Sequence, residues 1–279
     1  MSPARTQTPP KTAGRGHTDA PFFLGMGLIG SLYLVLILGM LVADASFTSP
    51  RYLWQALQSR EIRYAIKLSL LSCSLTAILS VWVATPIGYL MSRHRFPGKA
   101  VLDAVMDIPI VLPPLVIGLS LLILFQTPFG KGIERVIPVT YEIPSIILAQ
   151  FSVACAFAVR TLRATFDQIN PRQEQVALTL GCRRSQAFWL VVLPEARRGL
   201  LTAATLAWAR ALGEFGPILV FSGATRMRTE VLPTTVFLEL SVGHIEAAVA
   251  VSLLMVLAAV VVLVIIRCYG SAETLGRPL

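Results

Sequence analysis

Six long apolar runs constrain the fold of this chain more than any other feature of its sequence. Each run is long enough to cross a lipid bilayer as a helix, which takes roughly 17–25 residues. The 279 residues include 55% hydrophobic and only 14% charged ones, a composition that excludes a soluble domain. We therefore predict an all-α, polytopic helical membrane protein with six transmembrane helices. The predicted spans cover approximately residues 21–42, 68–91, 108–125, 143–159, 200–221 and 247–266.

The two ends of the chain differ in composition from the spans. Residues 1–20 are rich in Pro, Thr and Gly, which predicts a disordered cytoplasmic tail. A membrane domain over 21–268 follows, and 269–279 are predicted to form a short cytoplasmic tail. Ala43-Asp44-Ala45 resembles a signal-peptidase site, but the run before it is longer than the roughly 7–15 residues of a signal-peptide core. We therefore expect the first run to stay in the protein as an uncleaved helix.

The net charge of +9 suggests a nucleic-acid partner until its distribution is considered. With the amino terminus inside the cell, 15 Lys and Arg residues fall in cytoplasmic segments and 7 in external ones. Such an excess of positive charge on the cytoplasmic side is typical of membrane proteins. We predict that both termini and the segment 170–194 face the cytoplasm, and that the chain contacts membrane lipid and no nucleic acid.

The segment 170–194, NPRQEQVALTLGCRRSQAFWLVVLP, is a polar, arginine-bearing loop between two apolar runs. Asn170 is suited to cap a first helix, and Gly181 suits the left-handed end of that helix. Ser185 is expected to cap a second helix, which Pro194 stops. A helix–glycine–helix unit with small residues on one face can lie close to the backbone of another protein. The pattern therefore indicates a docking surface, whereas the simpler interpretation is an ordinary cytoplasmic loop.

The fifth run contains the charges that cost most to bury. Arg210 lies near the middle of the bilayer, and Glu214 follows one helical turn later, so the two can pair. Ala203 and Ala207 stand on the same helix face, which should point into the protein rather than to lipid. The pair suits either a structural role, fixing the helix register, or a place on the path of the transported solute.

Prolines interrupt the third run. Pro109, Pro113 and Pro114 each lack a backbone donor, so they are expected to break or kink the helix. A break in the membrane suits a hinge or gate whose freed helix end faces an anion, and the simpler interpretation is a packing kink. Asp103 and Asp107 are expected to complement a helix amino terminus rather than to act as catalytic carboxylates.

The remaining polar residues carry weaker signals. The chain has no phosphate loop of the Walker type, so we do not expect it to hydrolyse ATP in that manner. Its cysteines and histidines are scattered, so neither a metal site nor a disulfide framework is predicted. Six charged residues fall in the predicted external loops. Each one alone is explained as a solvated side chain, whereas the group as a whole suits salt bridges with a solute-delivering protein. They are Glu134, Arg135, Arg226, Arg228, Glu230 and Glu246.

The spacing within 170–194 resembles the permease signature of bacterial ABC importers, the loop on which the ATPase subunit docks. That signature begins with Glu and alanines, has a glycine one turn later, and ends in an aliphatic residue and Leu-Pro. Here the usual Glu stands one residue early, and Val176 replaces the usual alanine. The residues assigned to ATPase coupling are Glu174, Gln175, Ala177, Gly181, Val191, Leu193 and Pro194.

Two further segments extend the resemblance to approximately residues 61–267. With the loop, the runs DIPIVLPPLVIGLSLLILF and WARALGEFGPILVFSG resemble the permease subunit of molybdate, tungstate and sulfate ABC importers. The resemblance implies the type I importer permease (MetI-like) fold in a bacterial inner membrane. It also implies a chain that is no enzyme and binds no cofactor. Its partners would be two cytoplasmic ATPase subunits that use ATP and Mg, a second permease chain, with a homodimer expected, and an extracytoplasmic oxyanion-binding protein.

Other functions compete with this one. A secondary carrier would use an ion gradient, with Arg210 and Glu214 as its coupling site, but it leaves the docking signature unexplained. An ABC importer permease for a different solute shares that signature. A membrane-embedded enzyme would need a nucleophile–base pair or a metal spacing, and the sequence shows neither. Molybdate, tungstate and sulfate share charge and tetrahedral shape, so the sequence favours none of the three.

Overall fold

The computed structural model describes residues 20–272, and the predicted tails lie outside that range except for Ala20 and residues 269–272. Every regular element between these limits is a helix, which confirms the all-α prediction. The helices are α1 (Ala20–Phe47), α2 (Pro50–Gln58), α3 (Arg60–Arg93), α4 (Lys99–Val111), α5 (Pro114–Gln126), α6 (Pro128–Glu134), α7 (Ile143–Gln168), α8 (Pro171–Thr179), α9 (Arg184–Ala187), the π-helix η1 (Phe188–Val192), α10 (Leu193–Glu195), α11 (Arg197–Leu212), α12 (Gly216–Phe221), α13 (Leu232–Val242) and α14 (Ile245–Ala272).

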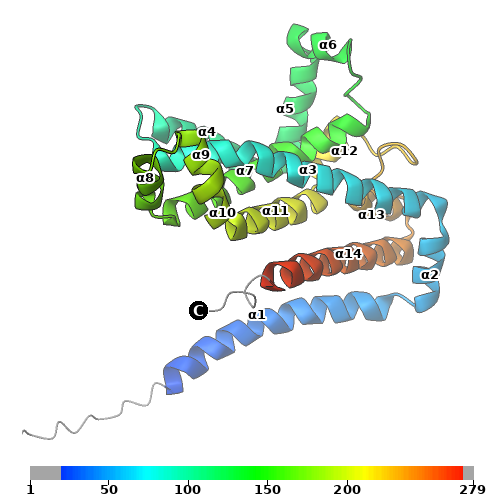
Figure 1. The fold of residues 1–279 in the computed structure, drawn as a ribbon. Coiled ribbons are helices and arrows are strands. Elements are labelled where there is room, and N and C mark those ends of the chain that lie inside the picture. Colours follow the sequence, from blue (N-terminus) through cyan, green and yellow to red (C-terminus); the bar gives the residue numbers. More distant parts are fainter. Residues whose placement is uncertain (1–19, 273–279) are drawn as a thin grey trace, which may run out of the picture. The chain divides into compact units, whose positions relative to one another are not determined.

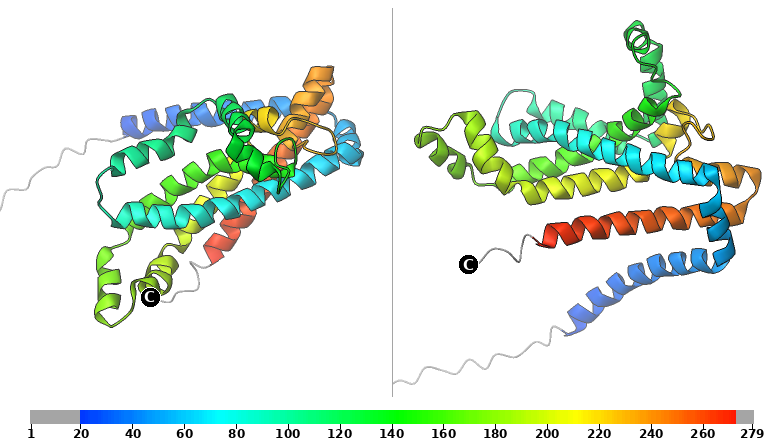
Figure 2. Two further views of the ribbon diagram at one scale, coloured as in Figure 1. Left: turned by 90° about the horizontal axis from the view of Figure 1, so that it is seen from above. Right: turned by 45° about the vertical axis from the view of Figure 1, so that its right-hand side comes forward.

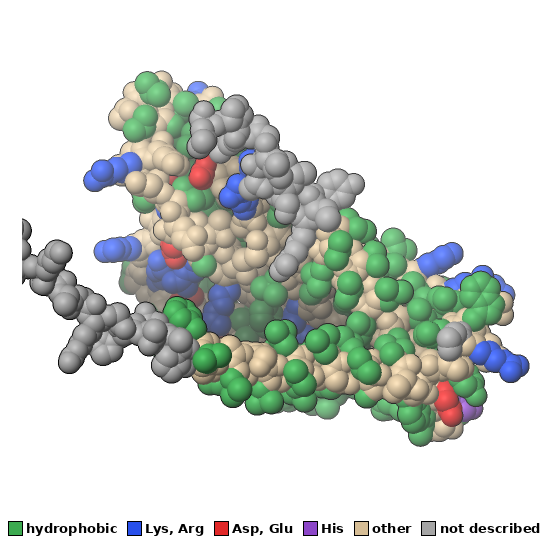
Figure 3. Space-filling model, turned by 90° about the horizontal axis from the view of Figure 1, so that it is seen from below, with side chains coloured by type: hydrophobic (Ala, Val, Ile, Leu, Met, Phe, Trp, Pro, Cys, Tyr) green, Lys and Arg blue, Asp and Glu red, His purple; other side chains and the backbone are tan. Residues whose placement is uncertain are grey.

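The chain divides into two compact units, residues 1–46 and 47–279. The described part of the first unit is α1, which covers the first apolar run and continues past it (Figure 1). No residue in its most apolar window is buried. Hydrophobic side chains are spread along the surface of the molecule in the space-filling view, as expected where lipid is the solvent (Figure 3).

Three helices, α3, α7 and α11, lie side by side at the centre of the second unit (Figures 1 and 2). Small side chains let them approach closely, and a Cβ atom on Gly88 of α3 would stand 3.0 Å from the backbone nitrogen of Arg163 on α7. A buried amide joins all three helices. Gln150 Oε1 accepts a hydrogen bond from Thr76 Oγ1 at 3.1 Å, and its Nε2 donates to the carbonyl oxygen of Ala211 at 3.2 Å.

The third apolar run is broken as predicted. Helices α4 and α5 meet at an angle of 110°, and Leu112 between them is extended. Pro114 opens α5, where its missing N–H costs nothing. Pro109 does not break the helix, because α4 continues past it to Val111. Single prolines are tolerated inside membrane helices when neighbouring groups satisfy the freed carbonyls.

The fifth run is also broken, although the sequence predicts one continuous span. Helix α11 ends at Leu212 and α12 begins at Gly216. Pro217 explains the break, because its ring would clash with the carbonyl oxygen of Gly213 in a continuous helix. Near the end of α11, the carbonyl of Ala211 accepts hydrogen bonds from the backbone N–H of Glu214 and from Gln150 Nε2, each at 3.2 Å.

Four described helices are long and apolar enough to span a membrane alone, and α4 with α5 make a fifth span when taken together. The predicted count of six is therefore not confirmed by helix length. Both broken pairs nevertheless contact α7. Asp107 of α4 pairs with Arg160 near the end of α7, whereas Phe125 of α5 and Phe221 of α12 share a core cluster with Ile146 near its start.

The last helix is longer than predicted. Helix α14 continues to Ala272, so the first residues of the predicted tail 269–279 are helical, and 273–279 lie outside the described residues. It packs against α13, and the turn that connects the two helices contains Gly243 in the left-handed conformation.

Candidate functional site

The loop 170–194 folds into short helices around one glycine. Asn170 Oδ1 accepts a hydrogen bond from the backbone N–H of Arg172 at 3.0 Å, so Asn170 caps α8 as predicted. Gly181 has φ +91°, the left-handed conformation predicted for the end of that helix. These two local features bring α8 and α9 together as a compact unit.

The second half of this loop differs from the prediction at both ends. Arg183, and not Ser185, is the capping position of α9, and its backbone N–H donates to Gln186 Oε1 at 2.8 Å. Pro194 does not stop the helix, because it lies in α10 directly after the π-helical turn η1. A π turn is wider than an α turn, and it gives the proline ring room beside the preceding carbonyls.

The residues assigned to ATPase coupling fall on different sides of this unit. Gln175, Gly181 and Pro194 are exposed, whereas Ala177 is buried and Glu174, Val191 and Leu193 are partly buried. The exposed side also carries two large apolar side chains, Val176 and Leu180, with 56% and 79% of their surface accessible. An exposed apolar patch beside an exposed glycine suits contact with another protein.

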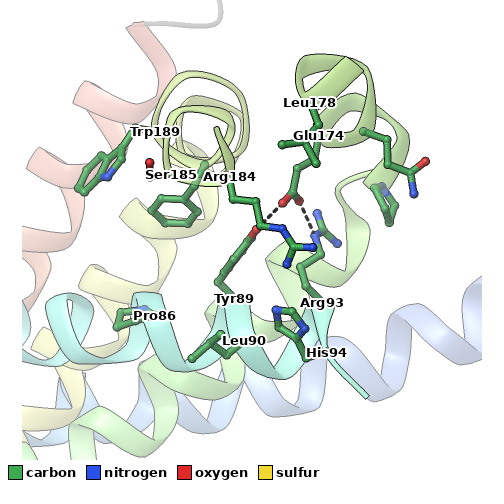
Figure 4. A pocket seen from close by; sticks show the side chains of 13 residues that line it. Pro86, Tyr89, Leu90, Arg93, His94, Glu174, Leu178, Arg184, Ser185 and Trp189 are labelled. Carbon is green, nitrogen blue, oxygen red and sulfur yellow. Dashed lines mark hydrogen bonds and ion pairs between the residues drawn. The ribbon is translucent and has the colours of Figure 1, made fainter. Parts of the chain in front are cut away.

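Glu174 points away from that outer side and toward α3 (Figure 4). Its Oε1 accepts a hydrogen bond from the hydroxyl of Tyr89 at 2.5 Å, and its Oε2 lies 3.3 Å from Arg93 Nε. Neither α3 residue is among the sequence-predicted site residues. The available signal was their spacing of four at the end of the second apolar run.

Arg210 and Glu214 form the ion pair that the sequence predicts, with Arg210 Nη1 2.6 Å from Glu214 Oε1. The Glu214 side chain is 1% exposed and that of Arg210 29%. Arg210 Cζ also lies 5.7 Å from the ring centre of Phe157 on α7. Ala203 and Ala207 are fully buried, so the charged face points into the protein as predicted.

The breaks in the third and fifth runs touch each other. A Cβ atom on Gly216 would stand 3.0 Å from Pro114 Cβ, and one on Gly118 would stand 2.8 Å from Pro217 Cα. The two glycines therefore let the backbones of α5 and α12 come together. This contact brings the proline candidates Pro113 and Pro114 next to the segment that holds Glu214.

Asp103 and Asp107 do not serve a helix amino terminus, contrary to prediction. Helix α4 begins at Lys99, so both aspartates lie beyond its first turn, where the helix dipole no longer favours them. Asp103 instead pairs with Arg163, and Asp107 Oδ2 lies 3.1 Å from Arg160 Nη2. The two ion pairs attach α4 to α7.

Several charges predicted to be external form ion pairs within the chain. Arg226 lies 2.7 Å from Glu61 and 2.8 Å from Glu239, and Arg228 pairs with Glu142. Burial alone would lower the pKa of Arg226, but its carboxylate neighbours outweigh that effect and raise the pKa.

The other external charges differ in exposure. Glu134 accepts hydrogen bonds from Thr140, and Glu230 is buried, which raises the pKa of its carboxyl group. Arg135 and Glu246 are exposed. Arg226 and Arg228 are exposed as well, although each pairs with a carboxylate of this chain.

Residues 84–270, which contain the loop 170–194 and both breaks, match the family described as binding-protein-dependent transport system inner membrane component. The chain belongs to this family. It is 33% identical to the sulfate transport system permease protein CysT of Escherichia coli over 256 residues, which cover 90% of this chain and 92% of that one. It is 32% identical to the molybdenum transport system permease protein ModB of Mycobacterium tuberculosis, over 88% of this chain and 93% of that one.

The fold agrees with this membership. The crystal structure of a bacterial ABC transporter involved in the import of the acidic polysaccharide alginate superimposes with a TM-score of 0.70. The match covers 91% of this chain and 96% of that one at 16% sequence identity. The chain is thus a multi-pass inner-membrane transport permease with the MetI-like fold of type I ABC importers.

Proposed function

We propose that this chain is the membrane-spanning permease subunit of an ATP-driven importer for a tetrahedral oxyanion: molybdate, tungstate or sulfate. The observation that carries the proposal is the alignment, over about nine-tenths of its length, with permeases named for sulfate and for molybdenum. Sulfate and molybdate are dianions of one shape, and permeases for both align with this chain at nearly equal identity.

The proposed assembly contains two permease chains, two cytoplasmic ATPase subunits and an extracytoplasmic binding protein that delivers the anion. The exposed side of the loop 170–194, with Gln175 and Gly181, receives the ATPase. The ATPase binds ATP and Mg, and this chain holds no cofactor. In this proposal both termini face the cytoplasm, and the excess of positive charge in the predicted cytoplasmic segments supports that orientation.

The anion path in this proposal passes the contact between the two broken spans. Arg210 is partly exposed and offers positive charge to a dianion, while Glu214 keeps the arginine in place. The break at Pro113 and Pro114 lies against α12, so movement there would open or close the path.

Uptake by cells tests this function. A strain without this gene should lose high-affinity uptake of at least one of the labelled anions molybdate, tungstate and sulfate, and the restored gene should return it. Deleting the partner ATPase should abolish the same uptake, and a proton uncoupler applied while ATP is maintained should not. Uptake that survives loss of the ATPase and stops with the uncoupler would identify a secondary carrier instead.

A further inference from the structure

Arg93, the last residue of α3, closes the carboxyl end of α7. Its Nη1 donates a hydrogen bond to the carbonyl oxygen of Phe166 at 3.0 Å, and its Nη2 donates to that of Ile169 at 3.1 Å. The last carbonyls of a helix have no further helical turn to pair with. The Phe166 carbonyl also accepts from the backbone N–H of Ile169 at 3.3 Å, and the guanidinium adds charged donors at both carbonyls. The remaining nitrogen of the group, Nε, faces Glu174 of α8 (Figure 4).

Tyr89 stands one turn earlier on α3 and contacts three other elements. Its ring packs edge-on against Phe166 of α7 and Phe188 of η1, with ring centres 5.8 Å and 4.8 Å apart. Its hydroxyl donates to Glu174 of α8. A single tyrosine therefore joins the end of α7 to both halves of the docking loop.

The cluster formed by Tyr89, Arg93 and Glu174 is largely shielded from water. The side chains of Arg93 and Glu174 are 11% and 13% exposed. Hydrogen bonds to charged groups are stronger away from water, and the planar guanidinium fixes the directions of all its partners at once. Gln175, the neighbour of Glu174, is exposed. Helix α8 is thus held on its inner side and free on its outer side.

We infer that Tyr89, Arg93 and Glu174 are positioning residues that transmit movement of α8 to α3 and α7. The inference rests on the proposed function, because an ATPase docked on the loop produces that movement. Since Arg93 binds the end of α7 and Glu174 together, a pull on α8 moves the ends of both long helices as one piece. The close contact between Gly88 and the α7 backbone carries the shift toward the membrane.

The test measures anion transported per ATP hydrolysed by the complete complex reconstituted in vesicles, with labelled molybdate or sulfate as the probe. Loss of charge-assisted contacts in Glu174→Gln should lower this ratio about tenfold. Tyr89→Phe keeps the aromatic packing and removes only the hydroxyl, so it should lower the ratio in the same direction with an intact fold. The ATPase should copurify with both variants at the wild-type yield.

Tyr64→Phe is the matched control, because it makes the same change on the same helix. Tyr64 lies near the start of α3, at the opposite end from Tyr89, and its hydroxyl donates to the carbonyl oxygen of Arg228. The transport ratio of this variant should therefore stay at the wild-type value. Tyr89→Phe and Glu174→Gln act on the same contact between α3 and α8. The double variant should therefore lower the ratio no further than the worse of the two single changes.

Two results would overturn the inference: an unchanged ratio in the folded, assembled variants, or loss of ATPase copurification with Glu174→Gln. The second result would make Glu174 a docking residue. A wild-type complex that hydrolyses ATP under these conditions and moves none of the three anions would contradict the proposed function instead.

Discussion

Glu214 keeps a carboxylate inside the protein where the helix α11 has already ended. Its partner Arg210 is more exposed than Glu214 itself, so the arginine has one side on the ion pair and another on a more open region. Removing one member of a buried pair leaves the other charge without compensation, whereas removing both can be nearly neutral. The two possible roles of the pair, structural and pathway, therefore respond differently to single and double substitutions.

Arg210→Ala should lower the amount of folded permease, because it strands Glu214 at a cost of about 3–5 kcal/mol. The double change Arg210→Met with Glu214→Leu should restore the yield. If the pair lies on the anion path, this well-folded double variant should still transport poorly. Yield by size-exclusion chromatography and uptake of labelled anion are the two measurements, and full uptake by the double variant would remove the pathway role.

Glu230 makes a second prediction, concerning pH. Burial raises its pKa, while a hydrogen bond with Thr235 and the charge of Arg226 act in the opposite direction. A carboxyl group with a raised folded pKa stabilises the protein fully below its unfolded pKa of about 4.3, and this contribution is lost as pH rises through the folded pKa. As pH rises, the Tm of the wild type should therefore fall compared with the Tm of Glu230→Gln measured at the same pH.

Melting curves in detergent from about pH 4 to pH 8 check this expectation. Glu246→Gln is the control, because it makes the same change at an exposed glutamate. A Tm difference between wild type and Glu230→Gln that is constant over this range would contradict it.

At the scale of elements, the docking loop depends on its central glycine. Gly181 has φ +91° and open space around its Cα, so a side chain there would project freely outward. Gly181→Glu should put an unpaired charge on the docking face and weaken ATPase binding by about 2 kcal/mol or more. The permease itself should still insert and fold.

Copurification of the ATPase measures the effect. Gly181→Asn is the control that distinguishes the effect of the added charge from the effect of adding a side chain at a left-handed position. Asn tolerates the left-handed conformation and carries no charge. This control should retain most of the ATPase. Recovery of the ATPase with Gly181→Glu at the wild-type yield would show that the glycine lies outside the docking face.

The features that the sequence predicts correctly are local ones. The apolar runs locate α1, α3, α7 and α14, because hydrophobic length is read from neighbouring residues alone. The cap at Asn170 and the left-handed Gly181 depend on the next few residues. Pairings between distant helices are different. Glu174 meets Tyr89, 85 residues away, and only the packing of α3 against α7 brings them together.

At the break before α12, two properties of the sequence point to different structures. Gly213 and Pro217 both disfavour a helix through this segment, but the apolar composition of the fifth run points to one continuous span. In the structure α11 ends at Leu212 and α12 begins at Gly216, and both helices still contact α7. Hydropathy measures how much chain can lie in lipid, and it does not measure whether that chain is one helix.

At the scale of the whole molecule, the main prediction is which segments of the chain face the cytoplasm and which face the outside of the cell. Single cysteines at Thr140 and Ser241 should react with a membrane-impermeant maleimide from outside the cell, and one at Ser185 only after permeabilisation. The native Cys73, Cys155, Cys182 and Cys268 are first replaced by alanine, since Cys182 is close to Ser185. Labelling at Ser185 in intact cells would overturn the topology with cytoplasmic termini.

The two broken crossings give the molecule a specific response to membrane thickness. Helices α3 and α7 are continuous and can meet a thicker or thinner bilayer only by tilting, whereas α4–α5 and α11–α12 can also change their angles at the breaks. Mismatch strain should therefore collect where Gly118 touches Pro217. In vesicles of phosphatidylcholines with increasing acyl-chain length, anion transport per ATP should change while ATPase docking stays constant. A transport ratio independent of chain length would show instead that the two breaks are rigid joints.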